Sequence, residues 1–457
     1  MIRARYRRIV FFFGRFLFSF AAWDLLLPLL GGRRWARKTR DHRLKKFASA
    51  YRSLAVRMGG VLIKVGQFLS SRVDILPVSF TEELEGLQDE VPAEDIQAIL
   101  QVAESEYGVP IEEKFAWFEE TPLASASFGQ VHRARLRSDQ LQGKWLRSWG
   151  LSSTRNLGDN VVVKIQRPNM ENIIATDLAA LRTVGNWLNR YHPIQKRMNI
   201  PALLEEFSRI LYEEIDYLME GSNAEKLAKN FEDYLDIRIP YVIWTHTTKR
   251  ALTLENVWGI KITDYEAITK AGIDRNAVAS RLLNAYLKQI FEDGFFHADP
   301  HPGNLFVNPK PESTSGKIEW DLTFVDFGMV GTVPPKLRQG LRELVMGVGT
   351  RDTERVIKAY QMMDLLLPNA DLQLLKRMEE KAFEQFWGMD MTELSEISFE
   401  EMHEFSKEFR EIIYEMPFQV PQNIIFLARC VSILSGICTG LDARFNLWNI
   451  YHPTQKN

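Results

Sequence analysis

Residues 293–307, with the sequence DGFFHADPHPGNLFV, constrain the fold of this chain more than any other stretch. Within them, the carboxylate of Asp299 is followed five residues later by the amide of Asn304. A second carboxylate, Asp326, comes 22 residues after Asn304, at the end of a short apolar run and before Phe-Gly. Enzymes that transfer phosphoryl groups from Mg-nucleotides use this set. One Asp orients the nucleophile, while the Asn and the second Asp hold magnesium on the phosphates.

The length of 457 residues allows one two-lobed enzyme or two to three separate domains. Two cysteines, Cys430 and Cys438, lie in an apolar stretch and lack the spacing of a zinc site. They therefore predict buried thiols in a reducing compartment.

Charge is distributed unevenly along the chain. Residues 1–50 contain thirteen Lys and Arg against Asp24 and Asp41, which gives this segment a formal charge of +11. Because the whole chain has a formal charge of −2, the remaining 407 residues carry −13. A basic arm on an acidic body predicts an anionic partner for the arm, with a membrane surface and a nucleic acid as candidates.

Residues 9–30 are rich in Phe and Leu and are long enough to cross a bilayer. Arg15, Asp24 and Pro28 interrupt the run, and each central charge costs about 3 kcal/mol, which offsets the gain from the apolar side chains. An amphipathic helix lying on the membrane is the first interpretation. A membrane span and a helix packed on the protein itself are the alternatives. The Phe and Leu content favours an anionic membrane, and no segment resembles a nucleic-acid-binding module.

Residues 48–76 have apolar side chains at helical spacing, and Pro77 marks the end of the predicted helix. Lys64 and Gln67 lie on one strip at the edge of the apolar face. They either form a solvated flank or point into a functional site. Three glycines reduce the stability of this helix by about 1 kcal/mol each, which indicates close packing against another element.

Residues 115–136 predict a strand pair around a turn of small residues, with Gly129 after the turn. Small residues let backbone amides approach phosphates, although this turn has alanines where a glycine-rich phosphate loop would have glycines. Residues 138–160 predict an inserted hairpin or loop. The turn consists of Ala124, Ser125, Ala126 and Ser127.

The buried strand predicted at VVVKIQ contains one lysine, Lys164. This lysine either lies at a strand edge or is the strand lysine that contacts nucleotide phosphates, and its position after the small-residue turn fits the second role. A helix predicted over 202–230 carries several acids. We expect Glu220 to pair with Lys164, which leaves Glu214 and Asp216 for other contacts.

Residues 237–244 and 250–255 predict two further strands, and 256–259 predict a hinge between lobes. A helix over 276–292 leads into the stretch described first. After Gly328 the chain passes two prolines and goes directly into a helical pattern. The long activation segment on which protein kinases place peptide substrates is therefore not expected.

These features resemble the UbiB family of atypical kinases, also called aarF-domain or ADCK kinases, over residues 48–445. The motifs that carry the resemblance are, in order, Lys64-x-Gly66-Gln67, Ala124-Ser125-Ala126-Ser127, Lys164, Glu214-x-Asp216, His297-x-Asp299 with Asn304, and Asp326-Phe327-Gly328. The resemblance implies an α+β, two-lobed protein-kinase-like fold with a helical N-terminal extension that folds over the peptide site of a protein kinase. The implied boundaries are 1–47 for a membrane-associating segment, 48–114 for the extension, 115–258 for the N-lobe and 259–457 for the C-lobe.

The resemblance also implies roles for the site residues. Lys164 contacts the α- and β-phosphates of ATP or ADP, and Asp299 orients or deprotonates the acceptor. Asn304 and Asp326 bind Mg²⁺. His297 supports the loop by hydrogen bonds. The other residues assigned to the catalytic group are Lys64, Gln67 and Glu220. The residues assigned to nucleotide binding are Ala124, Ser125, Ala126, Ser127, Lys164, Glu214, Asp216 and Glu255.

The family is associated with isoprenoid quinone biosynthesis and lipid handling at membranes, with ATPase activity rather than clear protein kinase activity. We therefore expect an ATP-dependent ATPase or small-molecule kinase that acts on a membrane lipid or prenyl-quinone intermediate. It would lie on the cytoplasmic side of a membrane, peripheral or N-terminally anchored, with quinone-biosynthesis enzymes as candidate partners. No apolar run of twenty residues follows residue 440, so the N-terminal segment is the expected membrane contact. A nucleotide-binding scaffold with little turnover and a true protein kinase are the alternatives.

Overall fold

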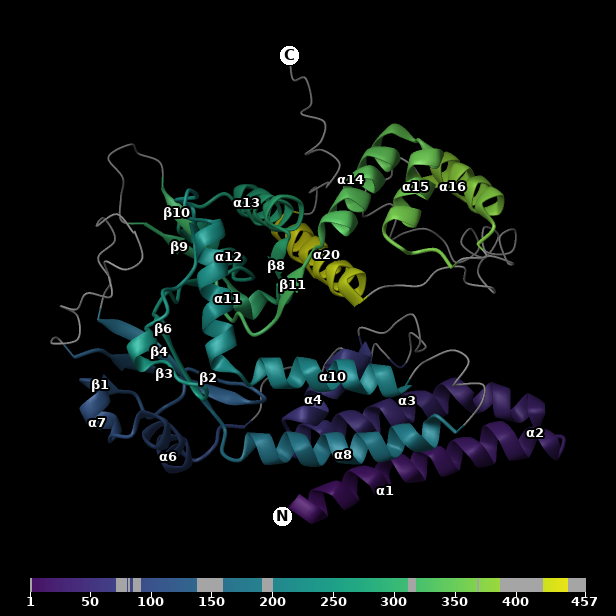
Figure 1. Cartoon of the computed structure of the whole chain (residues 1–457), viewed down its shortest axis with the longest axis horizontal. Coiled ribbons are helices and arrows are strands. Elements are labelled where there is room, and N and C mark those ends of the chain that lie inside the picture. Colours follow the sequence, from purple (N-terminus) through teal and green to yellow (C-terminus); the bar gives the residue numbers. More distant parts are fainter. Residues whose placement is uncertain are drawn as a thin grey trace. The chain divides into compact units, whose positions relative to one another are not determined.

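The computed structural model describes residues 2–70, 80, 83–84, 92–137, 159–190, 200–310, 318–367, 370–386 and 422–442. These residues form a mixture of helices and sheets, as expected for an α+β fold (Figure 1). The chain divides into two compact units. Unit 1 comprises Met1–Glu225 and Pro240–Val257, and unit 2 comprises Lys226–Ile239 and Trp258–Asn457.

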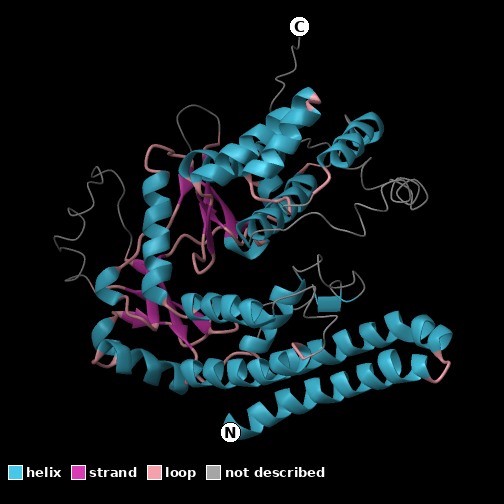
Figure 2. Cartoon of the chain, turned by 45° about the vertical axis from the view of Figure 1, so that its right-hand side comes forward, coloured by secondary structure: helices cyan, strands magenta, loops and turns pink. Residues whose placement is uncertain are grey.

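Unit 1 contains one antiparallel sheet and a set of long helices (Figure 2). Its helices are α1 (Ile2–Phe20), η1 (Ala21–Leu26), α2 (Leu27–Leu29), α3 (Arg33–Met58), α4 (Val61–Ser70), α6 (Ile96–Tyr107), α7 (Ile111–Lys114), α8 (Met170–Leu188), α10 (Ile200–Glu214) and η3 (Trp244–His246). Its strands are β1 (Trp117–Phe118), β2 (Ala124–Ser125), β3 (Gly129–Arg135), β4 (Asn160–Gln166) and β6 (Ala251–Glu255). Helix α11 (Tyr217–Asn230) begins in unit 1 and ends in unit 2.

The sheet of unit 1 places Lys164 on a central strand. Its strand order is β1-β3-β4-β6, and β2 pairs with β3. Because side chains alternate along a strand, Val163 and Ile165 of β4 enter a buried cluster with α6 and α7, while Lys164 points to the opposite face. Lys164 therefore does not lie at a strand edge.

The single helix predicted over 48–76 is wrong, because the chain forms two helices there. Helix α3 starts as early as Arg33 and ends at Met58, and α4 starts at Val61. Gly59 and Gly60 between them have φ angles of 63° and 60°, a left-handed conformation that glycine adopts without a steric penalty. In the sequence, these glycines were indistinguishable from glycines inside a helix. Residues 71–76 lie outside the described residues.

The apolar N-terminal segment packs on unit 1 along one face. Helices α1, α3 and α8 lie side by side (Figure 1), and Ile9 of α1 is fully buried. The ring of Phe16 stacks on Phe47 of α3 with 3.6 Å between ring centroids. The run Ile2–Leu29 is also long and apolar enough to cross a membrane, judged by length and composition alone.

The helix predicted over 202–230 is also interrupted. Helix α10 ends at Glu214 and α11 begins at Tyr217. At the break, Asp216 accepts hydrogen bonds from the backbone N–H groups of Leu218 and Met219 and so caps the start of α11. One acidic residue of this region therefore caps the start of a helix instead of lying on a helix face.

The strand predicted over 237–244 is much shorter in the structure. Only Ile237–Arg238 pairs as a strand, β5, and Trp244–His246 forms a turn of 3₁₀ helix. Pro240 comes two residues after β5, and proline has no N–H group for a strand ladder. The strand predicted over 250–255 is confirmed as β6. Of the insertion predicted over 138–160, residues 138–158 lie outside the described residues.

Unit 2 contains two small sheets and a set of helices. One sheet has the strand order β5-β10-β9-β7, and β11 pairs with β8 in the other. The strands after β5 are β7 (Ile260–Lys261), β8 (Phe295–His297), β9 (Leu305–Pro309), β10 (Trp320–Phe324) and β11 (Val330–Thr332). The helices are α12 (Tyr265–Lys270), α13 (Arg275–Lys288), η4 (Gln289–Asp293), η5 (Pro302–Asn304), α14 (Pro335–Thr350), α15 (Thr353–Met362), α16 (Leu372–Phe386) and α20 (Gln422–Leu441).

Two predictions about this unit are confirmed. The helix predicted over 276–292 corresponds to α13 and its π-helical continuation η4. After Gly328 the chain forms only the three-residue strand β11 before α14 begins at Pro335. No long segment therefore separates the Asp-Phe-Gly run from the next helix.

Candidate functional site

Strand pairing in unit 2 brings the two polar loops together. The loop that carries Asp299 and Asn304 connects β8 to β9, and the loop that carries Asp326 connects β10 to β11. Strand β8 pairs with β11, and β9 pairs with β10. The strands on both sides of the Asp299 loop thus pair with the strands on both sides of the Asp326 loop. The backbone N–H of Val325 also donates to the carbonyl of Asn304 at 2.9 Å.

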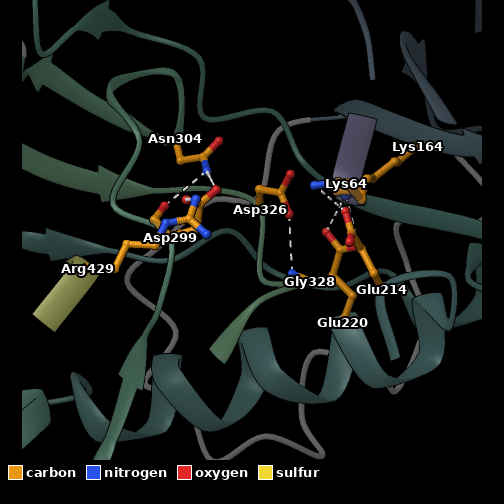
Figure 3. Close-up of polar contacts among 9 residues, drawn as sticks. All are labelled: Lys64, Lys164, Glu214, Glu220, Asp299, Asn304, Asp326, Gly328 and Arg429. Carbon is orange, nitrogen blue, oxygen red and sulfur yellow. Dashed lines mark hydrogen bonds and ion pairs between the residues drawn. The ribbon is translucent and has the colours of Figure 1, made fainter. Parts of the chain in front are cut away.

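The Asp299 carboxylate receives two donors (Figure 3). Asn304 donates through Nδ2 to the Asp299 carbonyl at 3.2 Å and to Oδ2 at 3.5 Å. Arg429 of α20 donates through Nη2 to Oδ1 at 3.3 Å. The guanidinium beside this carboxylate limits its orientations.

Asp326 is held in an unusual backbone conformation. Its φ angle is 62°, in the left-handed region, and its Oδ1 accepts the N–H of Gly328 at 3.2 Å. Aspartate tolerates this region better than most residues, since its side chain can bond to the local backbone. Strained residues of this kind cluster at functional sites, where the surrounding structure maintains them.

His297, at the end of β8, supports the loop of Asp326 by hydrogen bonds. It is fully buried, and its Nε2 lies 2.6 Å from the carbonyl of Asp326 and 3.3 Å from that of Val325. Because both partners are acceptors, Nε2 carries the hydrogen. Cys430 contacts the carbonyl of His297 with its Sγ at 3.8 Å. Burial, and then the Asp299 carboxylate, raise the pKa of the Cys430 thiol well above its usual range, so this cysteine is chemically inert.

The donor set of unit 2 fits a magnesium ion. Asn304 contributes an amide oxygen and Asp326 a carboxylate, and Mg²⁺ prefers oxygen ligands from one or two such side chains together with phosphates. Asn304 uses its Nδ2 toward Asp299, so its oxygen is the atom of this amide that faces away from that contact.

In unit 1, Lys164 forms the ion pair with Glu220 that the sequence favoured (Figure 3). Its Nζ donates to both carboxylate oxygens, at 2.8 and 3.0 Å. Glu220 is buried in the first turn of α11, where the positive end of the helix dipole favours a carboxylate. The pair thus fixes the lysine on its strand while leaving part of the side chain accessible.

Lys64 forms a second ion pair, with Glu214 of α10 at 2.6 Å. Both side chains are mostly buried, so Lys64 belongs to a packed polar contact rather than to a solvated flank. Gln67 is half-buried one turn further along α4.

Asp216 lies just after α10 and caps α11, and Glu255 is buried at the end of β6. Their roles in nucleotide binding stay predictions.

The small-residue turn is fixed by an arginine. Arg167, directly after β4, donates to the carbonyl of Ala126 at 3.0 Å and to Oγ of Ser125 at 2.8 Å. It also pairs with Glu94 at 2.9 Å. A side chain at Gly129 would collide with the Ile165 carbonyl, so a glycine is required where β3 approaches β4. The turn is thus held by side-chain hydrogen bonds from Arg167 and by the close approach of β3 to β4.

Arg167 and Arg429 were not identified from the sequence. Each acts through tertiary contacts with residues far away along the chain, 130 positions in the case of Arg429 and Asp299. Neither arginine stands in a motif. The only sequence signal for Arg429 is a cation inside an otherwise apolar helix.

The chain is similar in sequence to a known protein family. The model of the ABC1 atypical kinase-like domain matches residues 86–142 and 152–360, which is more than half of the chain. "Activity of bc1 complex kinase 8, chloroplastic" of Arabidopsis thaliana is 35% identical over 90% of this chain and 54% of its own length. A probable protein kinase UbiB of Xanthomonas campestris is 34% identical over 87% of this chain and 67% of its own length. The chain thus spans from about half to two thirds of these two relatives.

A solved structure supports the fold. The complex of Rv3197 with erythromycin from Mycobacterium tuberculosis matches with a TM-score of 0.54 and 20% identity, over 89% of this chain and 94% of that one. At this identity the match shows the fold alone. Together with the family model, it confirms the kinase-like fold expected from the sequence. This chain is a member of the ABC1 atypical kinase-like family, to which its UbiB-named relatives also point.

Proposed function

We propose that this protein is a Mg²⁺-dependent ATPase or small-molecule kinase that supports isoprenoid quinone biosynthesis, of the ubiquinone type, or membrane lipid handling. The observation that carries the proposal is the Lys164–Glu220 ion pair at 2.8 Å. Kinases require such a pair to position the lysine for the nucleotide phosphates. A scaffold that only binds nucleotide has less need of the intact set of Asp299, Asn304 and Asp326.

Each group of residues has a distinct task in this proposal. Lys164 binds the α- and β-phosphates, and the turn of residues 124–127 approaches them with its backbone amides. Asn304 and Asp326 would hold Mg²⁺, which neutralises phosphate charge when bound. Asp299 accepts the proton of the attacking hydroxyl or water, with Arg429 fixing the orientation of its carboxylate.

The acceptor is proposed to be a small molecule or water rather than a peptide. Only six residues, 329–334, separate Gly328 from the start of α14. This leaves no room for the segment on which a protein kinase places its peptide substrate. The relative from Xanthomonas is named UbiB, which motivates the choice of a prenyl-quinone intermediate. Enzymes of that pathway are proposed partners.

The proposed location is the cytoplasmic side of a membrane, with the N-terminal segment as the contact. The support is the apolar run Ile2–Leu29 together with the charge of +11 on residues 1–50. A membrane position would bring the enzyme to a lipid acceptor that water does not dissolve.

Lipid profiling of a deletion strain tests pathway and chemistry together. The strain is complemented with the wild type, with Asp299→Asn, or with the matched control Asp233→Asn, which changes an exposed carboxylate of unit 2. We expect the wild type and the control to restore the profile and Asp299→Asn to leave one prenyl-lipid intermediate accumulated. Full rescue by Asp299→Asn would contradict a catalytic role and favour the nucleotide-binding scaffold. An unchanged profile in the deletion strain would contradict the lipid pathway.

A further inference from the structure

The N-terminal hairpin, defined as α1, η1, α2 and α3, is tied to the rest of unit 1 by a polar anchor. Arg5 donates through Nε and Nη2 to the two oxygens of Asp177 on α8, at 2.7 and 2.6 Å. The Asp177 side chain is fully buried. Arg5 also donates to the carbonyls of Met58 and Gly59, at 2.8 and 3.3 Å, where α3 ends. Moving α1 away from α8 would leave a buried carboxylate without its counter-charge, which is strongly unfavourable.

The acidic residue within the apolar run, Asp24, is neutralised inside the hairpin. Asp24 accepts hydrogen bonds from Nη1 and Nη2 of Arg43 on α3, at 2.8 and 3.2 Å. The guanidinium of Arg43 in turn lies over the ring of Trp23, 5.1 Å from its centroid. The segment that could span a membrane by composition is thus paired with α3. The contacts of Arg5 and Asp24 hold it near its two ends.

The outward side of the hairpin exposes large apolar side chains and basic side chains. Phe11 is 73% exposed and Phe18 is 78% exposed, and at the tip Leu29 and Leu30 are 82% and 84% exposed. Basic side chains alternate with these apolar ones. The exposed basic residues of the hairpin are Arg3, Arg7, Arg8, Arg15, Arg33, Arg34, Arg37, Lys38, Arg40, Lys45, Lys46, Arg52 and Arg57. We call the surface formed by these exposed apolar and basic side chains the outer strip.

We propose that the outer strip docks on an anionic lipid bilayer, with α1 lying in the plane of the interface and remaining bound to α8. Large apolar side chains enter the boundary between headgroups and acyl chains, while arginines bind the lipid phosphates. The alternation of Phe11, Arg15 and Phe18 provides both on one side of α1. A span would instead place Arg15 in hydrocarbon and break the Arg5–Asp177 anchor.

Other occupants fit this surface less well. A second copy of the same strip would bring like charges together, because its exposed charges are predominantly basic. A nucleic acid would satisfy the arginines but would offer no apolar surface to Leu29 and Leu30. Membrane binding of this kind is independent of nucleotide, so its failure leaves the proposed nucleotide chemistry untouched.

Vesicle partition of the full chain tests the surface. Vesicles of phosphatidylcholine with 30% phosphatidylglycerol are compared with phosphatidylcholine alone, by sedimentation. Arg15→Gln should weaken partition about five-fold, which corresponds to about 1 kcal/mol per basic residue near an anionic surface. Phe18→Ser should weaken it about ten-fold through the loss of apolar insertion. The matched controls in unit 2, Lys270→Gln and Leu235→Ser, change residues that are also strongly exposed and should have no effect.

Equal partition to both vesicle types, or unchanged partition of both hairpin variants, would overturn the proposal. Self-association that these variants abolish, in a chain that does not bind vesicles, would overturn it in favour of a second copy. The variants should melt at the same temperature as the wild type. Lost binding then reflects the changed surface and not unfolding.

A cross-link distinguishes lying on the bilayer from crossing it. The hydroxyls of Tyr6 on α1 and Thr183 on α8 are 2.9 Å apart. Cysteines introduced as Tyr6→Cys and Thr183→Cys are joined by a short bismaleimide, while the native thiols are buried and burial raises the pKa of Cys438 to about 12. The cross-linked chain should partition as the unlinked double variant does. A loss of partition by ten-fold or more would show that α1 must leave α8, and would overturn in-plane docking.

Discussion

Arg429 donates a hydrogen bond to Oδ1 of Asp299 at 3.3 Å, while Asn304 donates to Oδ2 of the same carboxylate at 3.5 Å. The carboxylate proposed as the proton acceptor is thus held from both sides by residues of its own unit. Arg429 lies on α20 next to Cys430, which contacts the backbone of His297. The C-terminal helix therefore helps to shape the loop that carries Asp299.

We expect Arg429→Gln to lower ATP turnover about 10- to 100-fold, the range for losing a charge-assisted hydrogen bond. The affinity for Mg-nucleotide should stay unchanged, because Arg429 is not among the proposed metal or phosphate contacts. Arg429→Lys keeps the charge without the planar fork and should give an intermediate rate. Steady-state hydrolysis and nucleotide titrations are compared with the control Ser432→Ala on the exposed side of α20. Wild-type turnover in Arg429→Gln would exclude the positioning role.

Lys164 and Glu220 should act as one unit in nucleotide binding. Lys164→Met and Glu220→Gln are each expected to weaken binding, and the double variant should be little worse than either single variant. The coupling free energy from this double-mutant cycle should be about 1–3 kcal/mol, because the two side chains share the same contact. Isothermal titration with Mg-ADP measures all four proteins. Additive losses would mean that the ion pair does not position the lysine for nucleotide.

The Lys164–Glu220 pair could be predicted from the sequence because both residues stand in regular elements whose periodicity fixes their direction. Helix breaks were harder to predict, because they depend on backbone angles. Gly59 and Gly60 adopt positive φ angles and end α3, yet the apolar pattern continues through them. Asp216 was assigned to the nucleotide; in the structure its Oδ1 caps α11, a role that the sequence did not predict, and the nucleotide role stays a prediction. Arg429 had no sequence signal that linked it to Asp299, because that contact exists only after folding.

Asp177→Asn should lower the free energy of unfolding by about 2 kcal/mol, less than for a fully buried pair because Arg5 remains partly exposed. The variant leaves the Arg5 guanidinium without its counter-charge beside the end of α3. Chemical denaturation followed by tryptophan fluorescence measures the loss. Arg5→Met combined with Asp177→Asn removes both charges and should be less destabilised than the sum of the single variants. Strict additivity would contradict the anchor.

His246 should make stability depend on pH. Burial, together with the nearby Lys114 charge, lowers the pKa of His246 to about 4, from 6.5 for an unperturbed histidine. The unfolded chain therefore binds a proton at a higher pH than the folded chain does. Above pH 6.5 the neutral imidazole of the folded state makes its full contribution to the free energy of unfolding. This contribution is lost as the pH falls toward 4, by up to about 3 kcal/mol.

Unfolding free energies of the wild type and His246→Gln at pH 7 and pH 4 measure this contribution. The difference between the two proteins should shrink at the lower pH. His42→Gln, which changes an exposed histidine of α3, is the control and should leave the pH dependence of the wild type unchanged. A difference between wild type and His246→Gln that is constant from pH 7 to pH 4 would rule out titration of His246 as its cause.

Magnesium-dependent nucleotide binding tests the central claim most directly. Thermal-shift titrations with ATP, with and without Mg²⁺, compare the wild type with Asp326→Asn and with the control Asp233→Asn. Asp326→Asn removes one proposed metal ligand while keeping an oxygen that can accept the N–H of Gly328. We expect the wild type and the control to be stabilised by ATP only together with Mg²⁺, and Asp326→Asn to lose this stabilisation. Indistinguishable titrations of wild type and Asp326→Asn would contradict the assignment of the site.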